Sequence, residues 1–365
     1  MESLSDMELS MSLTLSSLNA INLDWVEQCM EKCLAPEDRG VEGYTFQQIG
    51  EGIGQLGSFG ILEVETQAGT KHAFFLKIQA ATKDFHQLCL DYQYYAREVN
   101  FYQYSAKTVA CRTAYPYYVE FNHERSEVLL VLEYMANWHT PDQIMGASRH
   151  QIEMAIEALI PINTQYWNRT QELSWLPNSK APFMLQIADD MVSNHQTFLE
   201  RFGHILSESQ LQKLAQIIAY YPRFAEIFTQ GTQTLTHWDF RVENIFYSSD
   251  ESEVAVIDWQ LALAHKPGWD LAYLLTTNID IELRREIFES SLAQYRRGLL
   301  AAGIEYSEEK LMKNMCQSMC AITCFSVIGG GNCDWENERS VLLFRKITER
   351  LFAAIEDYDA VKALV

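Results

Sequence analysis

The sequence has no uninterrupted apolar stretch close to the roughly 18 residues that a membrane-spanning helix needs, so a transmembrane protein is not expected. Its opening segment, MESLSDMELSMSLTLSSL, carries acidic side chains early and lacks the basic and then apolar pattern of a secretory signal peptide. We therefore expect a cytoplasmic protein with no membrane partner. Its eight cysteines are expected to be reduced thiols, because disulfides are rare in that compartment.

Clusters of Lys and Arg are also missing. The chain has 28 Lys and Arg against 49 Asp and Glu, which gives a formal net charge of −21. A field of this sign opposes binding to nucleic acid and to anionic lipid, so neither partner is expected. The same field favours a cationic ligand, although acidity also simply keeps a protein soluble.

The chain is long enough for two domains, since single cores stop growing near about 250–300 residues and this chain has 365. Residues 1–40 are expected to form a Ser- and Met-rich tail and a short amphipathic helix, as an appendage. Residues 41–134 are expected to form a small lobe. Short apolar runs broken by glycine and ending at Ala73–Ile78 predict a twisted antiparallel sheet, followed by a helix over 85–106 and a buried strand over Val128–Tyr134.

Residues 135–365 are expected to form a large, mainly helical lobe. The helical patterns cover approximately 148–166, 186–203, 208–228, 282–302 and 307–328. A β-like segment at 234–264 interrupts them and predicts a central hairpin. The glycines at 329–331 are interpreted as a turn between helices. The predicted fold class is therefore α+β, with a small sheet lobe and a large helical lobe.

The segment THWDFRVENIFYSSDESEVAVIDW, from Thr236 to Trp259, carries the most informative pattern. It contains H-x-D-x-x-x-x-N, then a strand, a tight turn, and a return strand that ends in Asp258. Phosphoryl transfer needs an aspartate to hold the acceptor hydroxyl, and an asparagine and a second aspartate to hold Mg²⁺ against the phosphates. Asp239, Asn244 and Asp258 have the order and spacing for those roles, and an accidental polar hairpin is the alternative.

The motifs at His237–Asn244, Ile257–Gln260 and Pro267–Leu275 closely resemble the aminoglycoside phosphotransferase and choline kinase-like superfamily, with the ecdysteroid-kinase-like group as the nearest branch. The resemblance implies a bilobal, protein-kinase-like fold with ATP and Mg²⁺ as cofactors and a small-molecule hydroxyl as acceptor. It also implies that His237 braces the catalytic loop by hydrogen bonds. Asp270 would support that loop as a structural carboxylate, and a helix N-cap is the alternative for it.

The small lobe must then supply a cover and a cation for the phosphates. A glycine-rich loop with G-x-G-x-x-G spacing lies between two strand-like runs, at Gly52, Gly54 and Gly57. Such a loop is a weak signal alone, because glycines also serve ordinary hairpins. Lys77 follows it inside an apolar strand, where an unpaired ammonium would be costly. Glu98 on the next helix is the natural partner, unless it faces solvent.

Other site residues follow from the resemblance. Glu133 and Met135 fall where the family's hinge offers backbone hydrogen bonds to adenine. Two roles are open for Arg241: neutralising the transferring phosphoryl group or bracing Asp239. Trp238 stands where the family usually has glycine, so its indole is expected to line the acceptor side of the site. It favours a flat or hydrophobic acceptor, or an amine stacked on the ring.

Several rival interpretations are weaker. Cys316, Cys320 and Cys324 recur every four residues, which is more typical of core packing than of a metal site. A Ser/His/Asp hydrolase is not supported, because no G-x-S-x-G pattern occurs. A protein kinase is not supported either, since no A-P-E signature follows Asp258. A nucleotide-binding pseudokinase remains the alternative from another class. The choice between a cationic acceptor and a steroid, terpenoid or sugar alcohol stays open.

Overall fold

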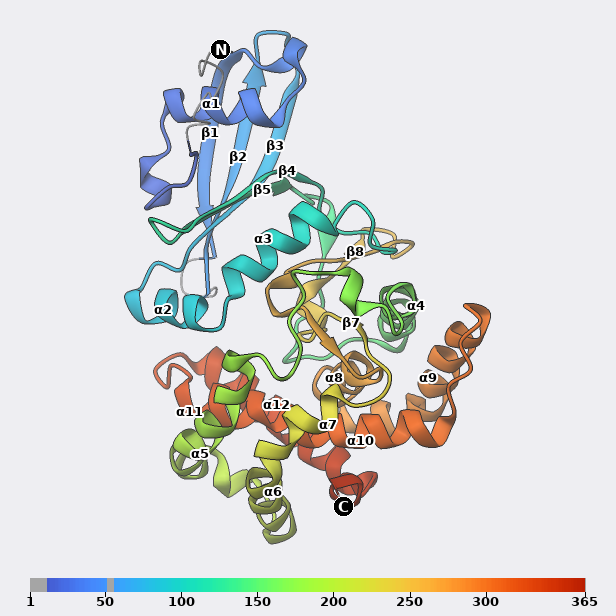
Figure 1. Ribbon diagram of the computed structural model, residues 1–365. Helices are drawn as coiled ribbons and strands as arrows, with labels where there is room; N and C mark the ends of the chain where they lie inside the picture. Colours follow the sequence, from blue (N-terminus) through green and yellow to red (C-terminus); the bar gives the residue numbers. More distant parts are fainter. Residues whose placement is uncertain (1–11, 51–55, 365) are drawn as a thin grey trace, which may run out of the picture. The chain divides into compact units, whose positions relative to one another are not determined.

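The computed structural model describes residues 12–50 and 56–364, and it divides the chain into two compact units (Figure 1). The first unit comprises Met1–Lys107 and Ala114–Ala136, and the second comprises Thr108–Thr113 and Asn137–Val365. The first is built on an antiparallel sheet and the second mainly on helices. The predicted α+β fold class, with a small sheet lobe and a large helical lobe, is confirmed.

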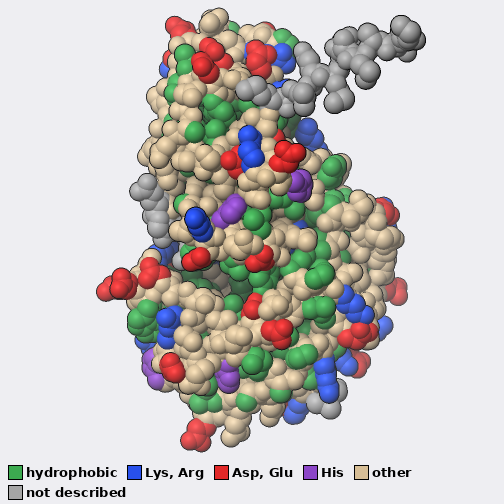
Figure 2. Space-filling view, turned by 60° about the vertical axis from the view of Figure 1, so that its left-hand side comes forward, with side chains coloured by type: hydrophobic (Ala, Val, Ile, Leu, Met, Phe, Trp, Pro, Cys, Tyr) green, Lys and Arg blue, Asp and Glu red, His purple; other side chains and the backbone are tan. Residues whose placement is uncertain are grey.

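The surface reflects the acidic composition of the chain. On the face drawn in Figure 2, Lys and Arg side chains lie scattered among Asp and Glu side chains, and apolar side chains fill some of the space between them. With a net charge of −21, the long-range field is negative. Any polyphosphate ligand would therefore depend on cations placed locally at its site.

The first unit has a five-stranded sheet in the order β1-β2-β3-β5-β4, with every neighbouring pair antiparallel. The strands are β1 Val41–Ile49, β2 Ser58–Thr66, β3 Lys71–Ile78, β4 Pro116–Asn122 and β5 Glu127–Glu133. The single helix expected over 85–106 is two helices, α2 Lys83–Asp91 and α3 Tyr94–Tyr104. They are separated at Gln93, whose φ of 56° lies in the left-handed region and ends the helical repeat.

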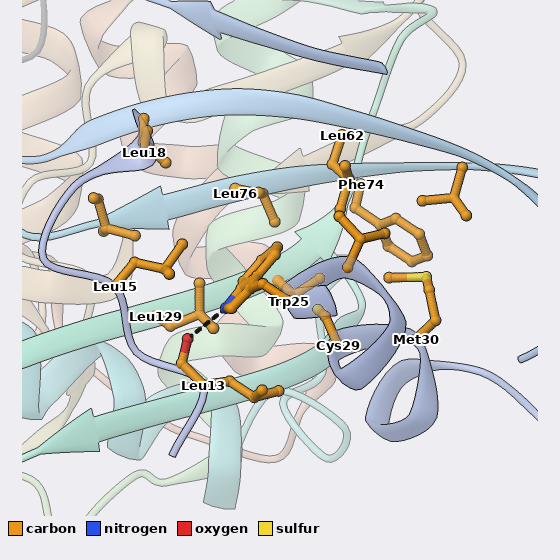
Figure 3. Close-up of a cluster of buried hydrophobic side chains, with 14 of the residues drawn as sticks. Leu13, Leu15, Leu18, Trp25, Cys29, Met30, Leu62, Phe74, Leu76 and Leu129 are labelled. Atoms are coloured by element: carbon orange, nitrogen blue, oxygen red, sulfur yellow. Dashed lines mark hydrogen bonds between the residues drawn. The ribbon is translucent and has the colours of Figure 1, made fainter. Parts of the chain in front are cut away.

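Residues expected to form an appendage are part of the core of the first unit, so that interpretation is wrong for them. Helix α1, Leu23–Cys33, was anticipated, but it packs with Leu13, Leu15 and Leu18 against one face of the sheet (Figure 3). The indole Nε1 of Trp25 donates to the carbonyl of Leu13 at 2.9 Å. The side chain of Gln79 donates to the carbonyl of Leu15 at 2.6 Å.

The second unit is mainly helical. Its helices are α4 Arg149–Gln165, α5 Pro182–Phe202, α6 Glu208–Tyr220, α7 Phe224–Thr229, α8 Trp269–Thr277, α9 Ile281–Ala301, α10 Glu308–Cys324, α11 Gly330–Asn332 and α12 Glu338–Asp357. Ser148 and Ser207 begin α4 and α6 with capping boxes, which satisfy amide groups that the first helical turn leaves unpaired. Every residue of α8 is buried, so this helix forms the centre of the unit.

The predicted β-like segment is confirmed as four short strands in two small sheets. β7, Thr234–Thr236, pairs with β10, Leu263–His265. β8, Ile245–Ser248, pairs with both β9, Val254–Val256, and β6, Trp138–His139. The β8–β9 pair is the expected hairpin, and its register places Ile245 opposite Val256.

The glycines at 329–331 do not form a turn, so that interpretation is wrong. A π-helical segment, Phe325–Gly329, continues α10 and leads into α11. This combined stretch, Glu308–Asn332, is long and apolar enough to cross a membrane by length and composition, but 78% of its most apolar window is buried inside the structure. Cys316, Cys320 and Cys324 are buried along α10, as the core-packing interpretation predicts.

Candidate active site

The loop after β7 is held from behind by one buried carboxylate. Asp270 is 1% exposed, and its two oxygens accept the backbone N–H groups of His237 at 3.0 Å and Trp238 at 2.8 Å. Burial raises the pKa of Asp270 to about 6, although His237 and the two amides oppose that shift. The supporting role expected for Asp270 is confirmed. The N-cap alternative is wrong, because Gly268 occupies the N-cap position of α8.

His237 ties the same loop to the strand that leads to Asp258. Its Nε2 lies 2.9 Å from the carbonyl oxygen of Ile257, and a carbonyl only accepts, so Nε2 carries the proton. The ring is fully buried and contacts the edge of Trp259 at a centroid distance of 4.8 Å. The bracing role expected for His237 is therefore present as a hydrogen bond, and it fixes the tautomer of the ring.

Asp239 is oriented by contacts with Asn244 and Arg241. The amide nitrogen of Asn244 donates to the backbone oxygen of Asp239 at 3.0 Å and to its carboxylate at 3.1 Å. The Nε atom of Arg241 lies 3.3 Å from the same carboxylate oxygen. The Tyr273 hydroxyl is near enough for the Asp239 charge to act on it: burial and, after it, that carboxylate raise the pKa of Tyr273 well above its usual value. The structure thus brings Asp239, Arg241 and Asn244 together in one cluster.

Tyr273 is a site residue that sequence reasoning missed. It lies within the Pro267–Leu275 motif, and it is 2% exposed on the buried helix α8. Its position three residues after Asp270, nearly one helical turn, was the available signal. A buried tyrosine hydroxyl is normally placed beside a polar group, and the charge of Asp239 acts on this one.

Arg241 is a fixed cation among carboxylates. Its Nη1 atom lies 2.8 Å from Glu243, in addition to the contact with Asp239. Burial opposes its charge, but Asp239, Glu243 and Asp258 outweigh that effect and hold the pKa of Arg241 above its usual value. The guanidinium therefore stays charged, and its contacts with Asp239 and Glu243 link side chains of the loop after β7.

Asp258 follows β9 at the end of the hairpin that also carries Asn244. The amide of Ile257 donates to the carbonyl of Asn244 at 3.0 Å, which joins the two strands directly beside both side chains. Asp258 has φ 61° and ψ 65°, a left-handed conformation that costs about 1 kcal/mol for a residue with a side chain. Gln260 donates to its carboxylate at 3.3 Å. The strain is consistent with a side chain that must point in one required direction.

The donor atoms in this unit suit Mg²⁺. Carboxylate and amide oxygens are the hard ligands that Mg²⁺ prefers, and it usually takes only one or two carboxylates from the protein. Asp258 and Asn244 match that pattern. Over residues 12–50 and 56–364, no cluster of three or more His, Cys, Asp or Glu side chains is arranged to hold a metal, so a thiolate or imidazole site is not indicated there.

In the first unit, Lys77 and Glu98 form a buried ion pair. Lys77 lies on β3 and Glu98 on α3, and their side chains approach to 2.7 Å. The side chains are only 7% and 3% exposed, so each charge needs the other. The pairing expected from the sequence is present, and the alternative of a solvent-facing Glu98 is wrong.

The remaining predicted residues of the first unit are placed as follows. Gly52 and Gly54 lie outside the described residues. Gly57 directly precedes β2, where a Cβ atom would come within 3.2 Å of the carbonyl oxygen of Ile78. Glu133 ends β5, and its carboxylate accepts the amide of Tyr115 at 3.1 Å. Met135 is buried just before the boundary of the unit.

Trp238 has the backbone conformation of a glycine. Its φ is 72°, a region that bulky side chains rarely adopt. The indole is 6% exposed and stacks face to face on Trp269, with centroids 4.8 Å apart and an interplanar angle of 8°. Trp269 in turn donates its Nε1 to the carbonyl of Trp238 at 2.9 Å. The glycine usual in the family is thus explained by the backbone, and here stacking offsets the strain.

These features define a protein-kinase-like fold of the kind found in small-molecule kinases, and the chain belongs to the ecdysteroid kinase-like family, whose model matches residues 61–305. Among solved structures, the chain is similar to a putative aminoglycoside phosphotransferase from Ralstonia eutropha JMP134, at 13% identity over 93% of this chain and 98% of that chain, with a TM-score of 0.54. The superfamily resemblance seen in the motifs is confirmed.

Two eukaryotic structures are similar to a comparable degree. Ethanolamine kinase from Plasmodium vivax matches at 12% identity over 93% of this chain and 89% of that chain, with a TM-score of 0.54. Choline kinase from Cryptosporidium parvum Iowa II matches at 10% identity over 92% and 94%, with a TM-score of 0.56. Identities this low establish the fold alone. No curated protein sequence matches the chain.

Proposed function

We propose that the protein is an ATP- and Mg²⁺-dependent kinase that transfers the γ-phosphate to a hydroxyl group of a small molecule. The observation that carries the proposal is the cluster of Asp239, Arg241 and Asn244, joined by hairpin hydrogen bonds to Asp258. These are the residue types that phosphoryl transfer requires, in the order that the family shows. Membership of the ecdysteroid kinase-like family supports it.

Asp239 would hold the acceptor hydroxyl and take its proton at the carboxylate. Asn244 donates to that carboxylate and so keeps it in one orientation. Arg241 would stabilise negative charge beside Asp239, because its guanidinium is already fixed there. The preorganised donors mean that little rearrangement is needed when the acceptor binds.

Asn244 and Asp258 would hold Mg²⁺, which when bound neutralises charge on the phosphates. In the first unit, Lys77 would bind the phosphates, and Glu98 keeps its ammonium in place. Gly52, Gly54 and Gly57 would offer backbone N–H groups to phosphate oxygens. Glu133 and Met135 would present backbone groups to adenine. Because the net charge of −21 repels a polyphosphate, these local cations and N–H donors would have to offset that repulsion at the site.

The proposal is tested first by nucleotide-dependent thermal stability, which needs no knowledge of the acceptor. Mg·ATP at about 100 times its Kd should stabilise the wild type by about 3 kcal/mol, as a higher melting temperature. Asp258→Asn removes one metal ligand, so the Mg²⁺-dependent part of this shift should disappear.

Asp250→Asn is the matched control, since Asp250 lies exposed in the turn at the other end of the same hairpin. It should keep the full shift. If Mg·ATP leaves the melting temperature of the wild type unchanged at millimolar concentration, the proposal is wrong.

A further inference from the structure

The second unit contains a cavity of about 240 Å³ whose lining comes entirely from that unit. Helices α5 and α7 (Figure 1) form one side of it through residues such as Ala188 and Ala225. Trp238, His265 and Trp269 form another side. Because Trp238 precedes the proposed catalytic Asp239, the cavity begins one residue from the reaction site.

The walls of the cavity are largely flat rings. Trp238 lies parallel to Trp269, and Phe224 lies parallel to Phe228 at a centroid distance of 5.3 Å and an interplanar angle of 12°. Both pairs line the cavity. Aromatic side chains make their most favourable contacts with another ring, which can stack on a face or meet an edge. The shape of the lining therefore selects a planar ligand over a branched aliphatic one.

Three buried polar atoms belong to residues of this lining and have no hydrogen-bond partner among the described residues. They are Oγ of Ser179, Nε1 of Trp238 and Nδ1 of His265. The three residues are 3%, 6% and 1% exposed. Native proteins rarely leave such atoms unpaired, so each needs an explanation. A ligand with a polar atom at its edge would provide the missing partner once the lining adjusts around it.

The charge of the ligand follows from the same residues. Burial lowers the pKa of His265 to about 3, so its imidazole is neutral near pH 7. Trp238 offers only a donor, which suits a ligand oxygen and not a cation. Asp189, exposed at the cavity, and the net charge of −21 both disfavour an anion. An uncharged ligand fits best.

The size of the ligand follows from the volume. An engineered cavity of about 150 Å³ lined by apolar side chains binds benzene. A cavity of about 240 Å³ therefore has room for one or two fused rings.

We propose that this cavity binds an uncharged one- or two-ring aromatic compound that carries a hydroxyl or carbonyl oxygen. The binding itself requires no nucleotide. Its role as the place that holds the ring of the phosphoryl acceptor rests on the proposed kinase function.

The experiment measures binding of 2-naphthol to the full chain by isothermal titration calorimetry, without nucleotide. Ala188→Phe and Ala225→Phe fill the cavity from two different helices at partly buried positions. Ala215→Phe, at an exposed position of α6 that does not line the cavity, is the matched control. We expect one site per chain, with affinity at least 10-fold weaker in both filling variants and unchanged in the control. 2-Naphthoate and choline should bind at least 10-fold more weakly than 2-naphthol.

Cooperative thermal unfolding of each variant shows that it is folded. Two filling variants are used so that the test still stands if one of them does not fold. Absence of 2-naphthol binding, binding that both folded filling variants leave unchanged, or tighter binding of choline would overturn the proposal. The Mg·ATP shift is measured on the same samples. A shift without 2-naphthol binding defeats this inference alone, whereas 2-naphthol binding without a shift defeats only the kinase function.

Discussion

Trp238 shows how one residue can combine two opposing effects. Its φ of 72° strains the backbone, while its indole stacks on Trp269 and lies 5.3 Å from the ring of Phe325. Steric strain of this kind costs of order 1–3 kcal/mol, whereas deleting a buried tryptophan ring typically costs about 3–5 kcal/mol. A bulky side chain therefore persists where glycine is usual, and sequence alone could identify the departure but not the stacking partner.

The strain can be measured by comparing two substitutions. Trp238→Ala and Trp238→Gly both remove the ring and should each destabilise the protein by about 3–5 kcal/mol. A variant with glycine is normally less stable than the same variant with alanine by about 0.5–1 kcal/mol. At φ 72° the order should reverse, so that Trp238→Gly is more stable than Trp238→Ala. Urea denaturation of both variants checks this. A Trp238→Ala protein more stable than Trp238→Gly would contradict the positive φ.

Asp270 gives a prediction for pH. Its pKa is raised to about 6 in the folded state, above the ordinary value of 3.8. The folded protein therefore binds this proton more tightly than the unfolded chain does. The stability that protonation adds is present below about pH 4 and is lost as the pH rises to about 6.

Asp270→Asn removes this dependence and leaves one of the two amides without its carboxylate acceptor. The variant should lose about 1–3 kcal/mol. Its deficit relative to the wild type should be larger at pH 5 than at pH 7, by about 1 kcal/mol. Denaturant unfolding at the two pH values measures both quantities, and a deficit that shrinks at pH 5 would show that the pKa of Asp270 is not raised.

At the scale of the element, helix α1 shows that the sequence pattern of one segment predicts a helix but not where that helix packs. The amphipathic helix over Leu23–Cys33 could be predicted, because its apolar spacing is encoded within the segment. Its docking could not, since packing against the sheet depends on Leu62, Phe74 and Leu129, which are distant in sequence (Figure 3). Long-range contacts decide such elements. Helix α12 is different: it is amphipathic and begins at the N-cap Asn337, so its pattern was available in the sequence and was overlooked.

Gly329, Gly330 and Gly331 were predicted to form a turn but lie in helical segments, for a related reason. A Cβ atom on Gly330 would lie 3.2 Å from the ring of Phe202, and one on Gly331 would lie 3.1 Å from Asn194. These glycines allow α5 to approach a helical segment closely, whereas sequence analysis took them for turn residues. Helical glycines with a packing role cannot be distinguished from turn glycines without the partner helix.

The N-terminal packing predicts the effect of one substitution. Trp25→Ala removes an 8%-exposed indole and its hydrogen bond to Leu13, so it should destabilise the protein by about 3–5 kcal/mol. Trp335→Ala, at a tryptophan that is 48% exposed, should cost less than half of that. Thermal and urea unfolding of the two variants compare them directly. Equal losses would mean that residues 13–34 do not contribute to the core.

At the scale of the whole molecule, the motif from His237 to Asp258 was the most predictable part. The cluster around Asp239 and the Lys77–Glu98 pair are each built from residues within one unit, and family motifs preserve their order. The docking of α1 and residues 13–18 on the sheet, the place of Tyr273 and the aromatic cavity depend on packing within a unit. They emerge only in three dimensions, which explains why sequence analysis missed them or left the acceptor open.

Acceptor-stimulated ADP release shows whether Asp239 serves phosphoryl transfer to a small-molecule hydroxyl. Wild type, Asp239→Asn and the control Asp250→Asn are compared with Mg·ATP across a panel of hydroxylated small molecules. We predict that an acceptor stimulates ADP release in wild type and control, and that Asp239→Asn lowers kcat by about 10²–10⁴-fold while keeping the Mg·ATP thermal shift. Acceptor-stimulated release that is unchanged in Asp239→Asn would contradict the account.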